Sequence, residues 1–304
     1  MPDSLRVLRP INLFFIAFAM SGLIGFGHFL RFGLPLYDIA NIWIGVLLIL
    51  TVCSVAASGY LINDIHDVET DQINKPNQTF IGISISENQA KVMYFALLID
   101  GLILSAILYY FTQKSALVLV VVATQVLLHI YARYLKKTLL WGNLTVAALT
   151  AFPYFLIAYI FEFDRLERAA ILVVLTMSIS AFVLNFIREV VKDWQDAKGD
   201  KVISAQTFIL RFGKSGTKTL LNFLLLLSMA IHAIMVYLWS IDYYFWSFIR
   251  LQWPLIVLVL LHIPFIVSLN QANFSAARMS AGLKLLMFIG VLWVYYLWYL
   301  VRMG

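Results

Sequence analysis

The chain has 304 residues, of which 62% are hydrophobic and 12% are charged, and its formal net charge is +6. A mean hydropathy of +0.88 lies far outside the range of soluble domains, so the composition excludes a soluble globular protein and predicts a polytopic membrane protein. The single cysteine, Cys53, excludes an internal disulfide and a cysteine-based metal site.

Nine apolar runs are long enough to cross a bilayer as helices. They cover roughly residues 11–30, 39–62, 92–111, 115–132, 140–160, 168–188, 218–239, 252–270 and 283–301. Some connections are short, such as residues 111–114, and short connections place neighbouring helices antiparallel. The predicted fold is therefore all-α, with nine transmembrane helices in one bundle and residues 1–304 forming a single domain.

The Lys and Arg residues are divided unevenly between the two sides of this predicted bundle. Sixteen of the 22 fall on the side that holds the N-terminus and the connections after the second, fourth, sixth and eighth runs. Such an excess marks the cytoplasmic side, so the N-terminus is expected in the cytoplasm and the C-terminus on the opposite side. Because no organellar transit segment is evident, the expected location is a bacterial inner membrane. This distribution also explains the net charge, so the expected surroundings are membrane lipids and not nucleic acid.

An acidic cluster follows the second apolar run, in the stretch Asn63-Asp64-Ile65-His66-Asp67-Val68-Glu69-Thr70-Asp71. Asp64, Asp67 and Asp71 are three and then four residues apart, so on one helix they would share a face and their carboxylates would converge. Hard divalent cations are the usual reason for such a cluster, and Mg²⁺ binds one or two carboxylates together with substrate phosphate oxygens. The spacing therefore predicts a Mg²⁺ site.

The same spacing returns after the sixth run, at Asp193, Asp196 and Asp200. Both triads fall on the predicted cytoplasmic side, together with the basic connection after the fourth run. Two carboxylate clusters near basic groups, at the mouth of an apolar bundle, suit a ligand with a diphosphate head and a hydrocarbon tail. The polar stretch 193–218 is expected to be a long loop that closes over the bound diphosphate.

Five further polar residues have two open interpretations each. Asn12 is either a polar residue bonded to a neighbouring helix or a substrate contact. Arg133 and Lys136 belong either to the positive-inside pattern alone or to a phosphate site that supplements Mg²⁺. Arg188 and Lys192 share a helix face that Asp196 continues, so they pair either with the aspartates or with a bound diphosphate.

Ionisable residues also occur inside the apolar runs. Asp100 is expected to face the bundle interior, because a carboxylate is costly in lipid. It has either a structural or a functional role there, and Asp100 and His66 are candidate catalytic bases. The isolated histidines His129, His232 and His262 are expected to be packed, hydrogen-bonded residues and not metal ligands.

The motifs Asn63-Asp64-x-x-Asp67-x-x-x-Asp71 and Asp193-x-x-Asp196-x-x-x-Asp200 resemble the two aspartate-rich motifs of the UbiA-type intramembrane prenyltransferases. Nine spans with both motifs on the cytoplasmic side match that family, so the resemblance covers essentially the whole chain. Arg9-Pro10-x-Asn12, and Tyr131 with Lys136, resemble its lesser motifs. Residues 71–76 and 188–193 are most similar to the branch that includes digeranylgeranylglyceryl phosphate synthase.

The resemblance implies Mg²⁺-dependent transfer of a polyprenyl group, geranylgeranyl in that branch, from its diphosphate to a hydroxyl of a glycerophosphate-type lipid, with release of diphosphate. The six aspartates would hold Mg²⁺, and Asn63 would orient a metal ligand or take part directly. The implied substrate contacts are Asn12, Lys75, Tyr131, Arg133, Lys136, Arg188 and Lys192. The acceptor's phosphate would need a second site, which the seven basic residues between 188 and 218 could provide.

Three other functions remain open. The first is prenylation of an aromatic acceptor of the 4-hydroxybenzoate or dihydroxynaphthoate type. The second is a cation-coupled transporter, which is disfavoured because transporter sites lie near the bilayer midplane whereas these triads are at helix ends. The third is a scaffold with a degenerate site, which is disfavoured because all six aspartates are present.

Overall fold

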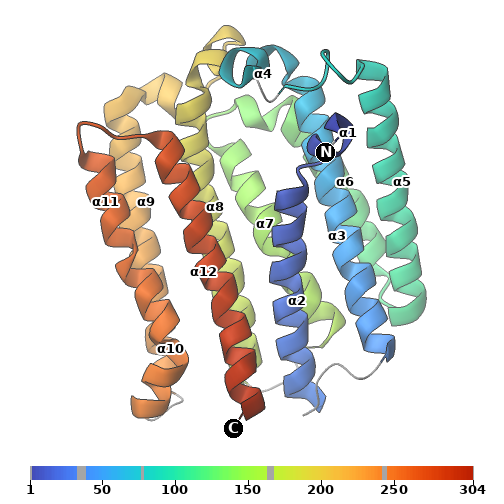
Figure 1. Cartoon of the computed structure of the whole chain (residues 1–304), viewed down its shortest axis with the longest axis vertical. Helices are drawn as coiled ribbons and strands as arrows, with labels where there is room; N and C mark the ends of the chain where they lie inside the picture. The colour runs from blue at the N-terminus through green and yellow to red at the C-terminus, as the bar shows by residue number, and fades with distance from the viewer. Residues whose placement is uncertain (1, 33–38, 77–78, 163–167, 242–244, 304) are drawn as a thin grey trace.

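The computed structural model describes residues 2–32, 39–76, 79–162, 168–241 and 245–303, and in these ranges the regular structure is helical. Nine of the described segments are long and apolar enough to cross a membrane, which confirms the predicted fold class. The long helices run side by side along one axis (Figure 1). They are α2 (Pro10–Phe32), α3 (Ile39–His66), α5 (Glu87–Thr112), α6 (Ala116–Arg133), α7 (Trp141–Ile160), α8 (Arg168–Val202), α9 (Phe208–Ser240), α10 (Phe245–Leu260), α11 (His262–Asn270) and α12 (Ala276–Met303).

Three short helices complete the described chain: α1 (Asp3–Arg6), α4 (Val68–Asn74) and the 3₁₀ helix η2 (Leu135–Lys137). α1 and α4 lie at one end of the bundle, whereas α12 finishes at the other (Figure 1). We call the first end the aspartate end, because it carries α4 and the last turns of α8, where the two acidic motifs are found. The opposite positions of the chain ends follow from an odd number of crossings.

The predicted long loop over residues 193–218 is wrong. α8 continues to Val202 and α9 begins at Phe208, so only residues 203–207 connect them. The stretch is polar, but polar residues are compatible with a helix whose other face packs against the protein, and Gly199, Asp200 and Ile209 are buried there. The only non-helical backbone within α9 is at Gly213, where φ is 66° and the helix kinks. The second acidic motif is therefore carried by a rigid helix and not by a closing loop.

α8 is the central element of the bundle, because it packs against α7, α9 and α12 and also against α4. α3 packs most extensively against α5. Buried apolar side chains form separate clusters along these contacts, represented by Leu23, Leu184 and Leu61, each with no exposed area or almost none. The third of these clusters lies beneath the first acidic motif, so the backbone that carries this motif is fixed by apolar packing.

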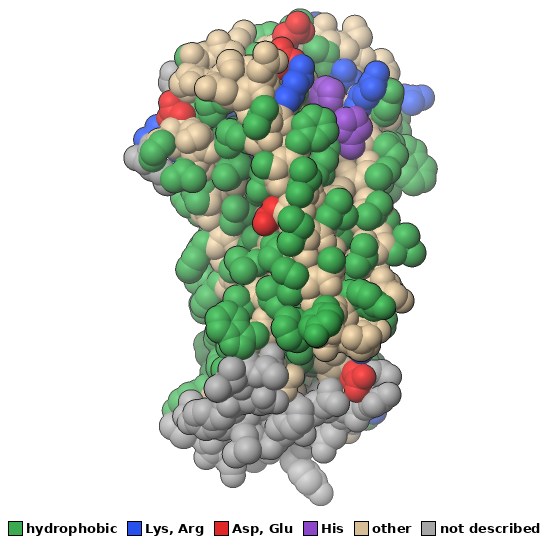
Figure 2. Space-filling model, turned by 90° about the vertical axis from the view of Figure 1, so that its right-hand side faces the viewer, with side chains coloured by type: hydrophobic (Ala, Val, Ile, Leu, Met, Phe, Trp, Pro, Cys, Tyr) green, Lys and Arg blue, Asp and Glu red, His purple; other side chains and the backbone are tan. Residues whose placement is uncertain are grey.

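The face drawn in Figure 2 is largely apolar along the described part of the helices, and most of its charged side chains gather at the aspartate end. Asp100 is exposed on the outside of α5, so the expectation that it faces the bundle interior is wrong. The buried face of α5 includes Tyr94, Gly101 and Ser105. Asp100 is the residue before Gly101, and one step along the helix rotates its side chain away from that face. An ionised carboxylate in this position costs about 2.5–3.5 kcal/mol in a bilayer.

The expectation for the isolated histidines agrees with the structure. His232 and His262 are almost fully buried, and both lie beside the Ser228 hydroxyl, at 3.4 Å and 2.8 Å. His232 also contacts the Ser180 hydroxyl at 2.9 Å. His129 contacts the Tyr94 hydroxyl at 3.3 Å. These histidines are parts of hydrogen-bonded packing between helices.

Candidate active site

The first acidic motif is divided between two helices. α3 ends at His66 and α4 begins at Val68, and Asp67 between them has φ −104° and ψ 3°. The prediction that Asp64, Asp67 and Asp71 share one helix face is therefore wrong. The chain changes direction at Asp67 because α4 packs against α8 instead of continuing along the axis of α3. This turn brings the first motif to the second.

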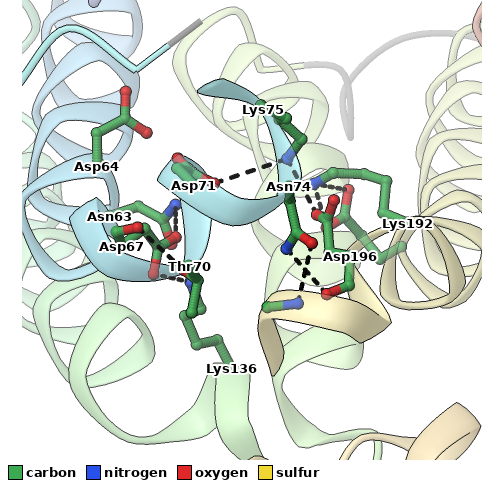
Figure 3. A network of polar contacts seen from close by, with 12 residues as sticks. Asn63, Asp64, Asp67, Thr70, Asp71, Asn74, Lys75, Lys136, Lys192 and Asp196 are labelled. Atoms are coloured by element: carbon green, nitrogen blue, oxygen red, sulfur yellow. Dashed lines mark hydrogen bonds and ion pairs between the residues drawn. The ribbon is translucent and has the colours of Figure 1, made fainter. Parts of the chain in front are cut away.

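Each carboxylate of the first motif has a basic partner. Asp64 accepts a hydrogen bond from the Arg9 guanidinium, and Asp67 forms an ion pair with Lys136. The Asn63 amide also donates to Asp67 at 2.7 Å. Lys75 lies 3.9 Å from Asp71 and completes the set (Figure 3). Clustered carboxylates are tolerated here because cations from the residue before α2, from η2 and from the end of α4 compensate their charge.

The second acidic motif lies within α8, as its spacing predicted. Asp193 accepts a hydrogen bond from the Asn143 amide at 2.8 Å, and Asp200 is almost fully buried. The Lys75 ammonium lies 3.0 Å from Asp196, so this lysine stands between the two motifs (Figure 3). The structure thus brings the two acidic motifs together at one end of the bundle, although more than a hundred residues separate them in the sequence.

Asn74 fixes α4 against α8. Its amide donates to the Asp196 carbonyl oxygen at 2.9 Å, and its side-chain oxygen accepts from the Gly199 N–H at 2.9 Å. The contact depends on a glycine, because a Cβ atom at residue 199 would lie 2.5 Å from the Asn74 nitrogen and 2.8 Å from the Thr70 carbonyl oxygen. Gly199 therefore sets the distance between the two motifs.

A second glycine positions Lys136. A Cβ atom at Gly142 would lie 2.8 Å from the Leu135 carbonyl oxygen and 2.8 Å from the Lys136 Cα atom. The start of α7 can therefore approach η2 closely only without a side chain at this position. The close packing places Asn143 against Asp193 and Lys136 against Asp67.

The acidic and basic groups of this network shift each other's pKa values toward the charged forms. Burial raises the pKa of Asp71 above its ordinary value, although Lys75 opposes the shift. Burial lowers the pKa of Lys75, but the carboxylates of Asp196 and Asp71 outweigh it and the net shift is upward. Burial also lowers the pKa of Arg9, but Asp64, Tyr60 and Asp71 together outweigh it and the net shift is upward. Lys75 and Arg9 therefore stay protonated while they hold the carboxylates.

The donor set fits a hard divalent cation. Among the described residues, no three histidine, cysteine or acidic side chains lie close enough to ligate one ion in this arrangement, in which basic groups pair with the carboxylates. Carboxylate oxygens are nevertheless the ligands that Mg²⁺ prefers. The Asn63 side-chain oxygen beside them is buried and has no hydrogen-bond partner in the part of the chain that the structure describes. A buried hydrogen-bond acceptor without a donor costs folding free energy. A bound metal ion, or a water molecule on that ion, would satisfy the Asn63 oxygen.

An apolar chamber of about 420 Å³ opens beneath this network. Its polar mouth is lined by Arg9, Asn12, Tyr60, Asn63, Tyr131, Arg188, Glu189, Lys192 and Lys284. The deeper wall includes Leu108, Leu117 and Val121. Arg9 and Asn63 belong both to the chamber lining and to the aspartate network. The polar end of a ligand in the chamber would therefore meet the acidic motifs.

The sequence-predicted substrate contacts divide into three groups. Asn12, Tyr131, Arg188 and Lys192 line the chamber, whereas Lys75 and Lys136 contact the aspartates from outside it. Arg133 does neither: it is exposed and lies over the ring of its neighbour Tyr134. The candidate bases Asp100 and His66 are exposed and do not line the chamber.

Several residues of the site were missed by sequence reasoning. Asn74 and Asn143 anchor the second motif, and Glu189 binds Arg188 and Lys192, which therefore do not pair with Asp196. Lys284 enters the chamber mouth from α12. A basic residue inside an otherwise apolar span is the signal that could have identified Lys284, since such residues usually face a polar interior.

Comparison with known proteins identifies the chain. A profile described as "UbiA prenyltransferase family" matches residues 26–292. The chain belongs to the UbiA prenyltransferase family. This finding confirms the predicted family and identifies the protein as a transferase. The apolar bundle with two aspartate motifs at one end is thus the fold of a UbiA prenyltransferase.

The relatives of this UbiA prenyltransferase include digeranylgeranylglyceryl phosphate synthases. The protein of that name from Saccharolobus solfataricus is 34% identical over 253 residues, which are 82% of this chain and 83% of the relative. The synthase from Methanosphaera stadtmanae is 28% identical over 294 residues, 94% of this chain and 95% of the relative. The predicted branch is confirmed by these similarities.

Solved structures share the fold of this UbiA prenyltransferase. One, from work on digeranylgeranylglyceryl phosphate synthase in membranes, has a TM-score of 0.62 and 26% identity and covers 96% of both chains. A UbiA homolog from Archaeoglobus fulgidus, solved with GPP and Mg²⁺ bound, has a TM-score of 0.66 and 17% identity and covers 100% of both chains. These matches extend over the whole bundle.

Proposed function

We propose that this protein transfers a geranylgeranyl group from geranylgeranyl diphosphate to the free hydroxyl of a glycerophosphate lipid, in a reaction that requires Mg²⁺ and releases diphosphate. The observation that carries the proposal is that an apolar chamber meets the first aspartate motif at Arg9 and Asn63, while Lys75 joins this motif to the second. The names of the similar synthases favour the glycerophosphate acceptor, and the A. fulgidus homolog bound to GPP and Mg²⁺ favours the metal.

The six aspartates at 64, 67, 71, 193, 196 and 200 are proposed to hold Mg²⁺, with Asn63 orienting a ligand. When bound, Mg²⁺ neutralises the diphosphate and stabilises the charge that develops on it as it leaves. Lys75, Lys136 and Arg9 now pair with these carboxylates, and with metal bound they would be available to phosphate oxygens. The apolar chamber holds the prenyl chain and excludes water from the electron-poor carbon at which the acceptor hydroxyl attacks.

The placement in the membrane follows from the charge distribution. The basic residues are concentrated on the side of the aspartate end, so we propose that this end faces the cytoplasm and that the C-terminus lies on the opposite side. Residues 1–304 would act as one domain, and the donor and acceptor would enter from the surrounding lipid. The location in a bacterial inner membrane stays a prediction.

The experiment that tests the proposed function is prenyl transfer by the purified full chain in lipid nanodiscs. Labelled geranylgeranyl diphosphate is supplied with and without Mg²⁺, and the acceptors are geranylgeranylglyceryl phosphate, 4-hydroxybenzoate and 1,4-dihydroxy-2-naphthoate. We expect an ether lipid product that disappears when EDTA removes the metal. A prenylated aromatic product would overturn the acceptor class, and activity without divalent metal would overturn the role of the aspartates.

The assignment of the prenyl chain to the chamber makes a separate prediction. Val121 is buried in the chamber wall on α6, about 18 Å along the helix from Arg133 at the aspartate end. Val121→Trp should fill the deep part and lower kcat/KM for geranylgeranyl diphosphate by about tenfold or more, while the shorter geranyl diphosphate is affected less. The next residue, Val122, is exposed on the outer face, so Val122→Trp is a matched control. Equal losses for both donors would contradict the assignment.

A further inference from the structure

A second group of charged side chains lies in the chamber mouth, apart from the pairs that the aspartates form. Arg188 and Lys192 from α8 both bind the carboxylate of Glu189, at 3.0 Å and 2.8 Å. Lys284 from α12 lines the same mouth and forms no ion pair with any residue that the structure describes. We call these four residues the α8–α12 basic cluster.

The charge of this cluster is not balanced by ion pairs with the residues that the structure describes. Three cations and one carboxylate leave a formal charge of +2 in a chamber whose remaining walls are mostly apolar. Arg188 and Lys192 are largely buried whereas Lys284 is exposed, and like charges gathered in one mouth repel each other, so an anion bound among them would stabilise all three. A phosphate monoester carries about −1.5 to −2 at neutral pH and would balance the cluster.

Arg188 has a buried hydrogen-bond donor that no described residue uses. Its Nη1 donates to Glu189, but its Nε is buried and has no hydrogen-bond partner among the described residues. A guanidinium has donors arranged in a fixed fork that matches two oxygens of one phosphate group. The ion pair with Glu189 holds the arginine in place and leaves the Nε donor for a second anion. The side chain is therefore oriented to donate a hydrogen bond to an anion in the chamber mouth.

The proposed reaction requires two anionic groups to be bound at once, a diphosphate on the donor and a phosphate on the acceptor. Like charges repel, so two separate sets of cations are needed. One set, Lys75, Lys136 and Arg9, is already paired with the aspartate motifs. The α8–α12 basic cluster is the other set, in which Arg188 and Lys192 are paired with Glu189 and not with the motifs.

We propose that Arg188, Lys192 and Lys284 bind the phosphate monoester of the acceptor lipid, with Glu189 fixing the first two. This assignment rests on the proposed function and specifies its acceptor site. This assignment replaces the expectation that a long loop after the sixth span provides the acceptor site. The chain is helical over most of residues 188–218, and of the seven basic residues in that range only Arg188 and Lys192 line the chamber. The acceptor's phosphate is thereby held on the wall formed by α8 and α12.

The test measures binding and turnover with the full-length protein in nanodiscs. Without donor and without Mg²⁺, geranylgeranylglyceryl phosphate should bind to the unmodified protein at least tenfold more tightly than geranylgeranylglycerol, which lacks the phosphate. Lys284→Met should weaken binding of the phosphorylated lipid by tenfold or more and leave the unphosphorylated lipid within twofold. In turnover it should raise KM for the phosphorylated acceptor and leave KM for geranylgeranyl diphosphate within twofold. Lys284→Arg should restore most of the loss.

Arg278→Met is the matched control, because Arg278 lies on the same helix, is exposed and does not line the chamber. Equal binding of the two lipids to the unmodified protein would overturn the proposal. A Lys284→Met effect on the donor KM would also overturn it, because the cluster would then serve the diphosphate. Phosphate-dependent binding without formation of an ether lipid would support the acceptor site and overturn the proposed function, so the two failures are distinguishable.

Discussion

Asp196→Ala is expected to lower kcat/KM for prenyl transfer by at least about 10³-fold, equivalent to ~4 kcal/mol of transition-state stabilisation. Asp196 is the partner of Lys75 at 3.0 Å, and its backbone carbonyl accepts from Asn74. The substitution removes a proposed metal ligand but leaves the backbone contact in place. Asp64→Ala, which frees Arg9, should have an effect of the same order. The measurement is the initial rate over a range of Mg²⁺ concentrations.

Glu69→Ala provides the control for loss of an acidic residue. Glu69 lies on α4 between two members of the first motif, but it is exposed. The Glu69→Ala variant should keep an initial rate of prenyl transfer and a dependence on Mg²⁺ within about twofold of those of the unmodified protein, because most exposed substitutions have small effects. All three variants should reach the membrane in similar amounts, because each replaces an acidic residue at the aspartate end and leaves the apolar residues of the spans unchanged. Full activity of Asp64→Ala or Asp196→Ala would refute the metal assignment.

Gly199→Ala is expected to lower prenyl transfer by about 10²-fold, because a displacement of about 1 Å in a catalytic group can have such an effect. The added methyl group would lie 2.5 Å from the Asn74 nitrogen and 2.8 Å from the Thr70 carbonyl oxygen, so α4 must move away from α8. The two acidic motifs would separate, and the unfolding free energy should fall by about 1–3 kcal/mol from overpacking. Thermal unfolding and initial rates measure the two effects.

Gly45→Ala is the matched substitution for this experiment. It adds the same methyl group at a buried glycine in the span α3, where the nearest neighbours are flexible side-chain atoms of Ile24 at 3.2 Å and 3.6 Å. Its effect on the rate should be small even if stability changes. An active Gly199→Ala protein would show that the distance between α4 and α8 does not determine catalysis.

The two acidic motifs show what sequence patterns can and cannot predict. The second motif lies on one helix, as its spacing indicated, because α8 continues regularly through Asp193, Asp196 and Asp200. The first motif has the same spacing, but its helix is interrupted at Asp67. The difference arises from packing against a distant segment, since α4 turns to contact α8 through Asn74. The spacing of the aspartates along the chain gives no information about the contact between α4 and α8.

The misplaced residues have the same explanation. Asp100 was expected inside the bundle and lies outside, because only the packing of α5 decides which of its faces is buried. The polar residues after Asp193 suggested a loop, but polar composition also suits a helix that faces a polar site. Lys284 was not assigned to the site, because nothing in its local sequence indicates that α12 lies beside α8.

The sequence by itself determined the class of protein, the number of spans, the two acidic motifs and the family. The class and the number of spans follow from composition and from the length of the apolar runs, because the bilayer sets helix length. The family follows from the resemblance of the two motifs to those of known prenyltransferases. The tertiary structure alone decided which cations meet which carboxylates and how the chamber joins the motifs. It also decided that three basic residues from two helices form a separate cluster. Those contacts join residues far apart in the chain, and their geometry is set by close packing between helices.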